Sequence, residues 1–371
     1  MKNKKISIIS LGVHGTNENY GAVLQIYAFQ EYLKEKFNAE VRVIDYYGLC
    51  TKNALFLEDH VLKRLIKNVI KKLKCLKKYF KKDGLFLRVR KNESFISKNI
   101  NKSIKYTYKD IDHAKFNSDI YIAESDVIWD PSFKRAGFDK NYFLDNNCFS
   151  NGKKIIYAAS LGDIKFSDTD KIIFQRLIST LDCVSVRENY ASEYIAQKFN
   201  RKVETLIDPT LFFDSDFYDK LLENTHSPIS KPYVLVYFPA YPNNNVIKSA
   251  EEYAKKYNWD VLYLCRTVIQ GKNTRIEYGI EEFLQCVKYA EAVFCDSFHG
   301  ICFSIIYKKL FFAFVREDGR KIEDVCMKFS LMNQLIDDGT LPTQKINYED
   351  VYEILNRERT KAYRWLSETM Q

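Results

Sequence analysis

The chain of 371 residues contains no run of the about 18 consecutive apolar residues that a membrane span requires. Its first 12 residues are basic and then apolar, but the apolar run is short and lacks the small-residue cleavage pattern of a signal peptide. Glycine (13) and proline (7) are scarce, which excludes collagen-like and low-complexity chains. We therefore expect a folded, cytoplasmic protein.

Motifs for metals, disulfides and nucleotides are also lacking. The nine cysteines are odd in number and show no CxxC spacing, which argues against a disulfide framework and a structural zinc site. There is no Walker loop and no GxGxxG, so phosphate-binding motifs do not support a nucleotide site. No recognition motif points to nucleic acid. We expect neither a metal nor a nucleic-acid partner.

Positive charge is concentrated in one segment. Residues 62–91 hold 13 lysines and arginines against one acid, so their net charge of +12 exceeds the +9 of the whole chain and the remainder is acidic. In 61–82 the apolar residues trace one helical face and lysines fill the other. This pattern favours binding to an anionic membrane surface. The alternative is a helix that packs on its domain with its lysines in solvent.

Apolar runs alternate with helical patterns along the chain. A strand at 5–11, a helix at 21–37 and a strand at 41–47 form a parallel α/β unit. Further strands are predicted at 119–124, 153–160, 183–188, 203–208, 233–238, 260–265, 292–297 and 310–315.

A polar stretch with two prolines, 223–232, predicts a domain boundary. We expect an α/β fold of two Rossmann-like domains with a cleft between them. Residues 1–225 form the first domain, with a basic amphipathic insertion at 61–91, and 232–347 form the second. A final helix occupies 348–371. Open α/β sheets bind ligands beyond the carboxyl ends of their strands, so residues just after the strands are the natural site candidates.

The strongest local signal is the strand-to-helix turn in 292–307. Asp296 ends the strand, Ser297 can cap the helix, and His299 and Gly300 follow at once. A helix start offers free N–H groups to an anion, and a histidine there can act as an acid or base near neutral pH. The alternative is a histidine that only caps the helix or packs in the core.

Cations follow two other elements. Arg187 ends the strand at 183–188 and can bind a carboxylate or phosphate in a bidentate manner. The alternative is an internal ion pair with Glu188 or another acid. Arg316, Arg320 and Lys321 precede a later helix and can complete an anion pocket, or lie in a solvated loop.

Two further loops carry candidate contacts to a sugar. After the first strand these are Asn19, Tyr20, Gly21 and Gln25. After the strand at 119–124, Asp126 can serve as a base and Trp129 can stack on a sugar ring, or both can be packing residues. Asp208, before Pro209 and Thr210, is interpreted as a strand-ending turn.

The chain resembles the polysaccharide pyruvyl transferase family. The blocks that carry the resemblance, in order, are NYGAVLQIYAFQEYL (19–33), ESDVIWD (124–130), YAASLG (157–162), SVRENYASEY (185–194), IDPTLFF (207–213), DSFHGICFSIIYKKLFFAF (296–314) and RKIEDV (320–325). The chain departs from the family pattern at Glu124, where glycine is usual, and at Val127, where glutamine is common.

The resemblance implies a glycosyltransferase-B-like fold with the donor on the second domain. It implies phosphoenolpyruvate as donor co-substrate, no bound cofactor, and a cyclic pyruvate ketal as product on a sugar, which we expect to be a lipid-linked galactose or related hexose in capsule or exopolysaccharide synthesis. It also implies donor binding by Arg187, by His299 and by Lys321 or Arg320. His299 is the expected general acid, and Asp126, Asp296 or His299 itself the base. The rivals are a glycosyltransferase that uses a nucleotide sugar and a non-enzymatic binding protein of the same fold.

Overall fold

The computed structural model describes residues 3–13, 18–49, 84–132, 137–222, 228–239, 244–315, 319–336, 341–342 and 345–371. The basic stretch at 61–82 and Arg316 lie outside the described residues. Among the described residues, no helix is long and apolar enough to traverse a bilayer. None of the seven described cysteines forms a disulfide.

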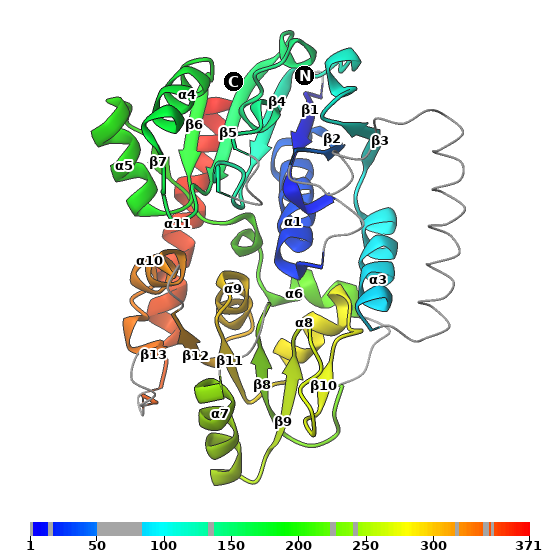
Figure 1. Cartoon of the computed structure of the whole chain (residues 1–371), viewed down its shortest axis with the longest axis vertical. Coiled ribbons are helices and arrows are strands. Elements are labelled where there is room, and N and C mark those ends of the chain that lie inside the picture. Colours follow the sequence, from blue (N-terminus) through cyan, green and yellow to red (C-terminus); the bar gives the residue numbers. More distant parts are fainter. Residues whose placement is uncertain are drawn as a thin grey trace.

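The first domain is built on a sheet of seven parallel strands in the order β3-β2-β1-β4-β5-β6-β7 (Figure 1). The strands are β1 (Lys5–Ile9), β2 (Glu40–Tyr47), β3 (Lys102–Thr107), β4 (Ile120–Glu124), β5 (Lys153–Ala159), β6 (Cys183–Val186) and β7 (Glu204–Thr205). Its central strands are buried on both faces, as their uninterrupted apolar runs predict.

The second domain repeats this topology with six parallel strands in the order β10-β9-β8-β11-β12-β13. The strands are β8 (Tyr233–Tyr237), β9 (Asp260–Leu264), β10 (Thr274–Arg275), β11 (Ala292–Cys295), β12 (Leu310–Phe314) and β13 (Leu335–Ile336). Both orders contain the 3-2-1-4-5-6 arrangement of a doubly wound Rossmann sheet. The predicted pair of Rossmann-like domains is therefore confirmed.

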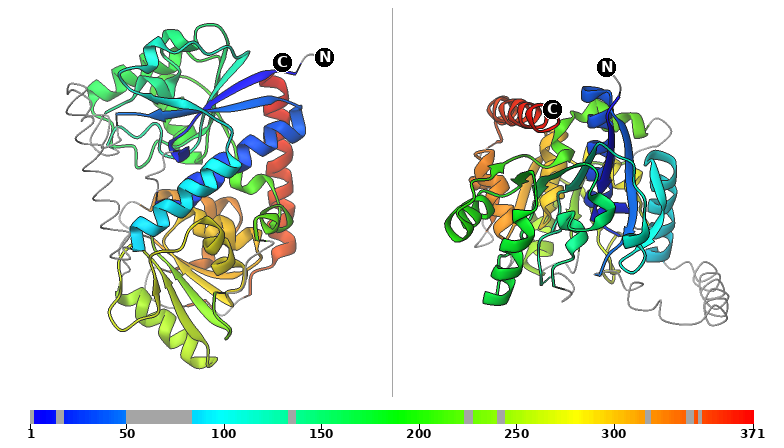
Figure 2. Two further views of the ribbon diagram at one scale, coloured as in Figure 1. Left: turned by 90° about the vertical axis from the view of Figure 1, so that its right-hand side faces the viewer. Right: turned by 90° about the horizontal axis from the view of Figure 1, so that it is seen from above.

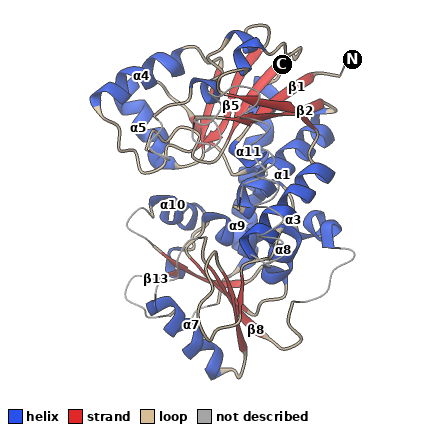
Figure 3. Cartoon of the chain, turned by 45° about the vertical axis from the view of Figure 1, so that its right-hand side comes forward, coloured by secondary structure: helices blue, strands red, loops and turns tan. Residues whose placement is uncertain are grey.

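The described α-helices cover both sheets and join them. They are α1 (Tyr20–Phe37), α3 (Gly84–Asn99), α4 (Asp168–Ser179), α5 (Asn189–Phe199), α6 (Ser215–Asp219), α7 (Asn244–Lys256), α8 (Ile280–Lys288), α9 (Phe298–Ile306), α10 (Arg320–Lys328) and α11 (Tyr348–Thr369). In Figure 3 the two sheets lie in opposite halves of the molecule, with α9 and α10 on the side of the second domain that faces the first.

Two helices cross from one domain to the other (Figure 2). The last residues of the predicted basic insertion, 84–91, belong to the first of these, α3, and are not all solvated: Arg88 is buried and donates to the carbonyl oxygen of Cys265 at 2.8 Å. The second, α11, begins in the second domain, and its carboxyl-terminal half packs on the first, with Trp365 edge-on to Tyr157 and Tyr363 stacked on Phe37.

We expect the packing of α11 to contribute strongly to stability. Leu366 is fully buried on this helix, so Leu366→Ala should lower the free energy of unfolding by about 2–5 kcal/mol through the cavity it leaves. Glu368→Ala, at an exposed position of the same helix, should change it by less than about 0.5 kcal/mol. Denaturant unfolding of both variants checks this. Equal effects would contradict a packed α11.

Candidate active site

A pocket of about 150 Å³ lies between the two domains. The first domain contributes Asn19, Asp126 and Arg187; the second contributes Pro239, Asp296, Ser297, Phe298, His299, Gly319, Lys321 and Ile322. Asp126 follows β4 and Asp296 follows β11, and each of these strands lies beside the first strand of its sheet, where the strand order reverses. The ligand-binding edges of two Rossmann sheets therefore meet at this pocket.

The start of α9 forms the second domain's wall of the pocket. Ser297 is the N-cap, and its hydroxyl accepts a hydrogen bond from the backbone N–H of Gly300 at 3.3 Å. His299 lies in the first turn and is buried, with 6% of its surface exposed. Free N–H groups at this helix end favour an anion in the pocket.

His299 is held between the two domains. Its Nε2 lies 3.6 Å from Oδ2 of Asp208, which belongs to the first domain. On the other side the ring meets Gly21 at the start of α1, where a Cβ atom would lie 2.1 Å from both Cγ and Nδ1 of His299. Gly21 thus permits a close approach, as expected, but the group that approaches is His299 and not a sugar.

Arg187 is buried in a network of carboxylates. Its Nε donates to Glu188 at 2.8 Å and its Nη1 to Asp208 at 3.0 Å, while its guanidinium stacks on Phe298 with Cζ 4.0 Å from the ring centroid. Burial alone would lower the pKa of Arg187, but the carboxylates of Glu188 and Asp208 outweigh it and raise that pKa. The ion pair and the pocket contact that the sequence left as alternatives are both present.

Asp208 is fully ionised in this network. Burial pushes the pKa of its carboxyl upward, but His299 and Arg187, together with the N–H of Thr210, hold that pKa well below its usual range. A buried carboxylate is stable only when such partners compensate its lost hydration. Asp208 is therefore a fixed negative charge between a cation of its own domain and the histidine of the other.

The segment after β4 presents Asp126 to the pocket in a strained backbone conformation. Ser125 and Asp126 have φ angles of 39° and 51°, in the left-handed region that non-glycine residues rarely adopt. The hydrogen bonds that hold this turn come from the neighbouring strand, because Ser125 N–H donates to Tyr157 and Ser160 N–H donates to Asp126. Such strain at a pocket edge is typical of functional positions.

A model of the family described as polysaccharide pyruvyl transferase matches residues 19–318. The chain belongs to this family. The resemblance is thereby confirmed, and the chain is a transferase of polysaccharide synthesis. No protein with a curated description matches it in sequence.

Comparison with solved structures agrees on the fold of this pyruvyl transferase family member. The structure assigned as a UDP-N-acetylglucosamine 2-epimerase from Listeria monocytogenes aligns over 98% of this chain and 91% of its own, with a TM-score of 0.51 and 11% identity. The UDP-GlcNAc 2-epimerase from Neisseria meningitidis aligns over 99% of each chain, with a TM-score of 0.48 and 9% identity. The first of these supports the glycosyltransferase-B-like arrangement of the two domains.

The later cations of this pyruvyl transferase differ in position. Lys321 lines the pocket. Arg320 is exposed and lies over the ring of Tyr190, with Cζ 5.5 Å from its centroid. Of the two residues that the resemblance offered as a donor-binding cation, the structure brings only Lys321 to the pocket.

Three of the predicted sugar contacts are buried packing residues, which corrects the expectation from sequence. Trp129 is fully buried, stacked on Phe143, and donates through its ring nitrogen to the carbonyl oxygen of Tyr142. No face of its ring is free to stack on a ligand.

Tyr20 and Gln25, both on α1, also point away from the pocket. Tyr20 stacks on Phe283 with its centroid 4.8 Å away and donates its hydroxyl hydrogen to the carbonyl oxygen of Tyr278, so it joins the domains. Gln25 is fully buried and donates to Glu124 at 2.7 Å. Asn19 does line the pocket, and it caps α1 by accepting hydrogen bonds from Gly21 and Ala22.

Sequence analysis missed the role of Asp208 in this family member. Its interpretation as a turn residue was sound, since Oδ1 caps a short 3-10 helix (Pro209–Phe212) by accepting from the N–H of Thr210 at 3.0 Å. Its other oxygen, Oδ2, contacts Arg187 and His299. The available signal was its place just beyond a strand end, which it shares with Asp126, Arg187 and Asp296.

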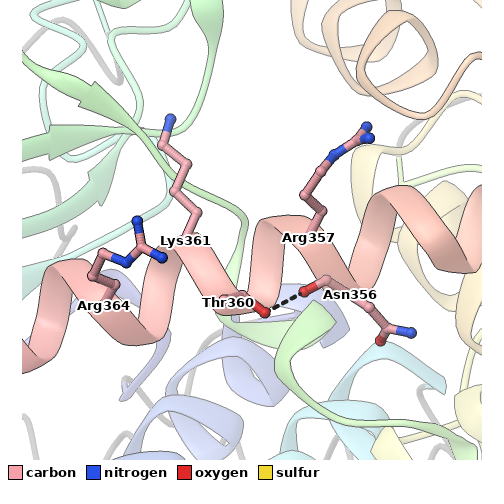
Figure 4. Close-up of a pocket in the computed structure, with 5 residues that line it drawn as sticks. All are labelled: Asn356, Arg357, Thr360, Lys361 and Arg364. Carbon is pink, nitrogen blue, oxygen red and sulfur yellow. Dashed lines mark hydrogen bonds between the residues drawn. The ribbon is translucent and has the colours of Figure 1, made fainter.

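A larger hollow of about 450 Å³ runs along α11 but lacks acid–base chemistry. Its lining residues, Asn356, Arg357, Thr360, Lys361 and Arg364, all project from that one helix (Figure 4). Lys361 already pairs with Glu204 at 3.0 Å. The interdomain pocket, with its histidine, cations and carboxylates, is the better candidate for the active site.

Gly21→Ala should destabilise the protein, because the new methyl group overlaps the ring of His299. We expect a loss of about 1–3 kcal/mol, although alanine is intrinsically favoured over glycine in a helix. In a His299→Ala background the two contacts at 2.1 Å vanish and only the one to Cβ at 2.6 Å remains, so the loss should shrink. Thermal unfolding of the four proteins measures this; an unchanged loss in the double variant would refute the contact.

Glu124 predicts a pH dependence of stability. Burial raises the pKa of its carboxyl to about 8 from 4.5, so between these values the folded protein keeps a proton that the unfolded chain releases. Stability from this group is full below pH 4.5 and is lost as pH rises toward 8, by at most about 1.4 kcal/mol per pH unit. Unfolding measured from pH 5 to 8 should show Glu124→Gln, which cannot ionise, gaining stability relative to the wild type; a constant difference would contradict the raised pKa.

Proposed function

We propose that the protein transfers the enolpyruvyl group of phosphoenolpyruvate to a sugar and closes it into a cyclic ketal, with the interdomain pocket as the active site. The observation that carries this proposal is the joint presence of His299, Lys321 and the α9 amino terminus around one small pocket in a chain of this family. A carboxylate and a phosphate on one donor need cations and helix N–H groups together.

The size of the pocket supports a small donor. The described residues enclose about 150 Å³, whereas sites for drug-sized ligands span roughly 300–1,000 Å³. A nucleotide sugar would need considerably more room than phosphoenolpyruvate. The volume that the described residues enclose is thus compatible with phosphoenolpyruvate as the donor.

In the proposed reaction His299 protonates the C3 methylene of phosphoenolpyruvate, which makes C2 electrophilic. A sugar hydroxyl adds at C2, and its proton passes to a base, for which Asp126 and Asp296 are the carboxylates that line the pocket. Phosphate then leaves with the electron pair of the C2–O bond. A second hydroxyl of the same sugar attacks C2 and closes the ketal ring, and its proton returns to the neutral imidazole of His299.

We place the acceptor on the side of the first domain, near Asn19 and Asp126. In this proposal it is a lipid-linked galactose or related hexose, modified at the inner face of the cell membrane during capsule or exopolysaccharide assembly. The basic stretch at 61–82, outside the described residues, would hold the enzyme there by its charge.

The first test is phosphate release from phosphoenolpyruvate with galactose-, glucose- and N-acetylhexosamine-terminated lipid diphosphates. One of these acceptors should stimulate release, and His299→Ala should lower the rate by roughly 100-fold or more because the general acid is lost. His113→Ala is the matched control. This histidine is exposed and does not line the pocket, so the variant should keep wild-type rates.

Calorimetry separates the alternatives. Binding of phosphoenolpyruvate that weakens in Lys321→Ala supports the donor assignment. Absence of phosphoenolpyruvate binding, with binding of a nucleotide sugar instead, would overturn the proposal in favour of a glycosyltransferase. If neither phosphoenolpyruvate nor a nucleotide sugar binds, the wild type shows no turnover, and His299→Ala changes only the stability, the protein is a non-enzymatic binding protein.

A further inference from the structure

We infer that Asp208 is a positioning residue for His299: its carboxylate faces the Nε2 side of the ring from the opposite domain, so that Nδ1 is the atom that exchanges a proton with the ligand. This inference rests on the proposed function for the chemical step, but its geometric part concerns the protein alone. It assigns to Asp208 a role that the sequence motif did not indicate.

Asp208 is immobilised by its neighbours. Its Oδ1 accepts hydrogen bonds from the N–H and the hydroxyl of Thr210 at 3.0 and 2.8 Å. Its Oδ2 accepts from Arg187 at 3.0 Å and from the hydroxyl of Ser125 at 3.2 Å. Only 1% of the surface of Asp208 is exposed, and both of its oxygens are hydrogen-bonded. The carboxylate therefore cannot rotate to follow the histidine. The histidine has to orient toward it.

The ring of His299 has one orientation that satisfies both domains. Nε2 is buried, lies 3.6 Å from Oδ2 of Asp208 and has no hydrogen-bond partner among the described residues, whereas Nδ1 is not among the buried unpaired atoms. Gly21 at the start of α1 limits the ring near Cγ. A carboxylate beside one ring nitrogen favours the tautomer with the proton on that nitrogen. The neutral ring therefore carries its proton on Nε2 and leaves the lone pair of Nδ1 for catalysis. An aspartate also orients the histidine of the Ser-His-Asp triad, but there it faces Nδ1 and the two ring nitrogens exchange roles.

The proton balance of the step follows from this arrangement. In the imidazolium both nitrogens carry a proton. The Nδ1 proton goes to C3 of phosphoenolpyruvate, the π electrons of the donor form the new C–H bond, and C2 becomes electron-deficient. The N–H electrons return to Nδ1, and Asp208 stays ionised throughout, since its pKa is held far below neutral pH.

Several charges besides Asp208 act on the ring. Those lining the pocket or paired with its residues are Arg187, Glu188, Asp126, Asp296 and Lys321. The carboxylates favour the imidazolium and the two cations oppose it. Of the acids, Asp208 is the one whose carboxylate lies 3.6 Å from a ring nitrogen, so its removal should have the largest effect on the ring's tautomer.

The experiment compares Asp208→Asn with Glu188→Gln. Each variant takes one carboxylate from Arg187, but only Asp208→Asn changes the group that faces His299. Nitrogen NMR of imidazole-labelled protein, with the signal assigned through His299→Gln, gives the tautomer of the neutral ring.

We expect the Nε2–H tautomer in the neutral wild type. Asp208→Asn removes the negative charge that favours this tautomer, so the Nδ1–H form should become populated, whereas Glu188→Gln leaves the tautomer in place. A neutral wild type with the proton on Nδ1, or an equal change of tautomer in the two variants, would overturn the inference. If Asp208→Asn does not fold, the wild-type tautomer decides.

The two proposals fail separately. NMR needs neither donor nor acceptor, so the predicted tautomer and its change in Asp208→Asn in a protein without pyruvyl transfer would support Asp208 as the orienting group and sink only the proposed reaction. Pyruvyl transfer with the opposite tautomer would retain the reaction and sink the role of Asp208.

Discussion

One buried carboxylate, that of Asp208, links the two domains electrostatically beside the interdomain pocket. A charge that is removed from water is stable only with partners of opposite charge or with hydrogen-bond donors. Asp208 finds Arg187 in its own domain and His299 in the other. Because His299 also abuts Gly21, the histidine is correctly surrounded only when the domains meet as they do here. The site is thus a property of the interface and of neither domain alone.

The rest of the interface holds this arrangement in place. Beside the site, Lys328 on α10 donates to the carbonyl oxygen of Arg187 at 3.0 Å, and Asp324 accepts from the N–H of Asn189 at 2.8 Å. Farther away, α3 and α11 cross between the domains and bury side chains in both (Figure 2). Catalytic groups contributed by two domains need such support, because an error of about 1 Å in their separation is costly to catalysis.

The sequence predicted the sheets and the site's edge better than it predicted individual contacts. Apolar runs locate the buried strands, and topology then places residues such as Asp126, Arg187 and Asp296 at carboxyl strand ends. An apolar run in the sequence does not show which residue a side chain contacts across the domain interface. From the sequence alone, Trp129 and Tyr20 look like ligand contacts. In the structure the ring of each stacks on a phenylalanine, and the polar atom of each donates a hydrogen bond to a backbone carbonyl oxygen. Asp208 was identified as a turn residue, because its second oxygen meets partners 21 and 91 positions away.

Because Arg187 is already paired with carboxylates, other groups of the pocket have to bind an anion. Two carboxylates already bind its guanidinium, and Phe298 covers one of its faces. The two carboxylates outnumber the guanidinium, so this group of three charges is net negative and does not by itself attract an anion. Lys321 and the N–H groups at the start of α9 line the pocket outside this group, and they lie on the second domain. The wall that carries His299 is therefore the more favourable one for an anion, although Asp296 lies on that wall too, and Asp126 faces it from the first domain. The pocket thus combines positive groups and carboxylates from both domains within a small volume.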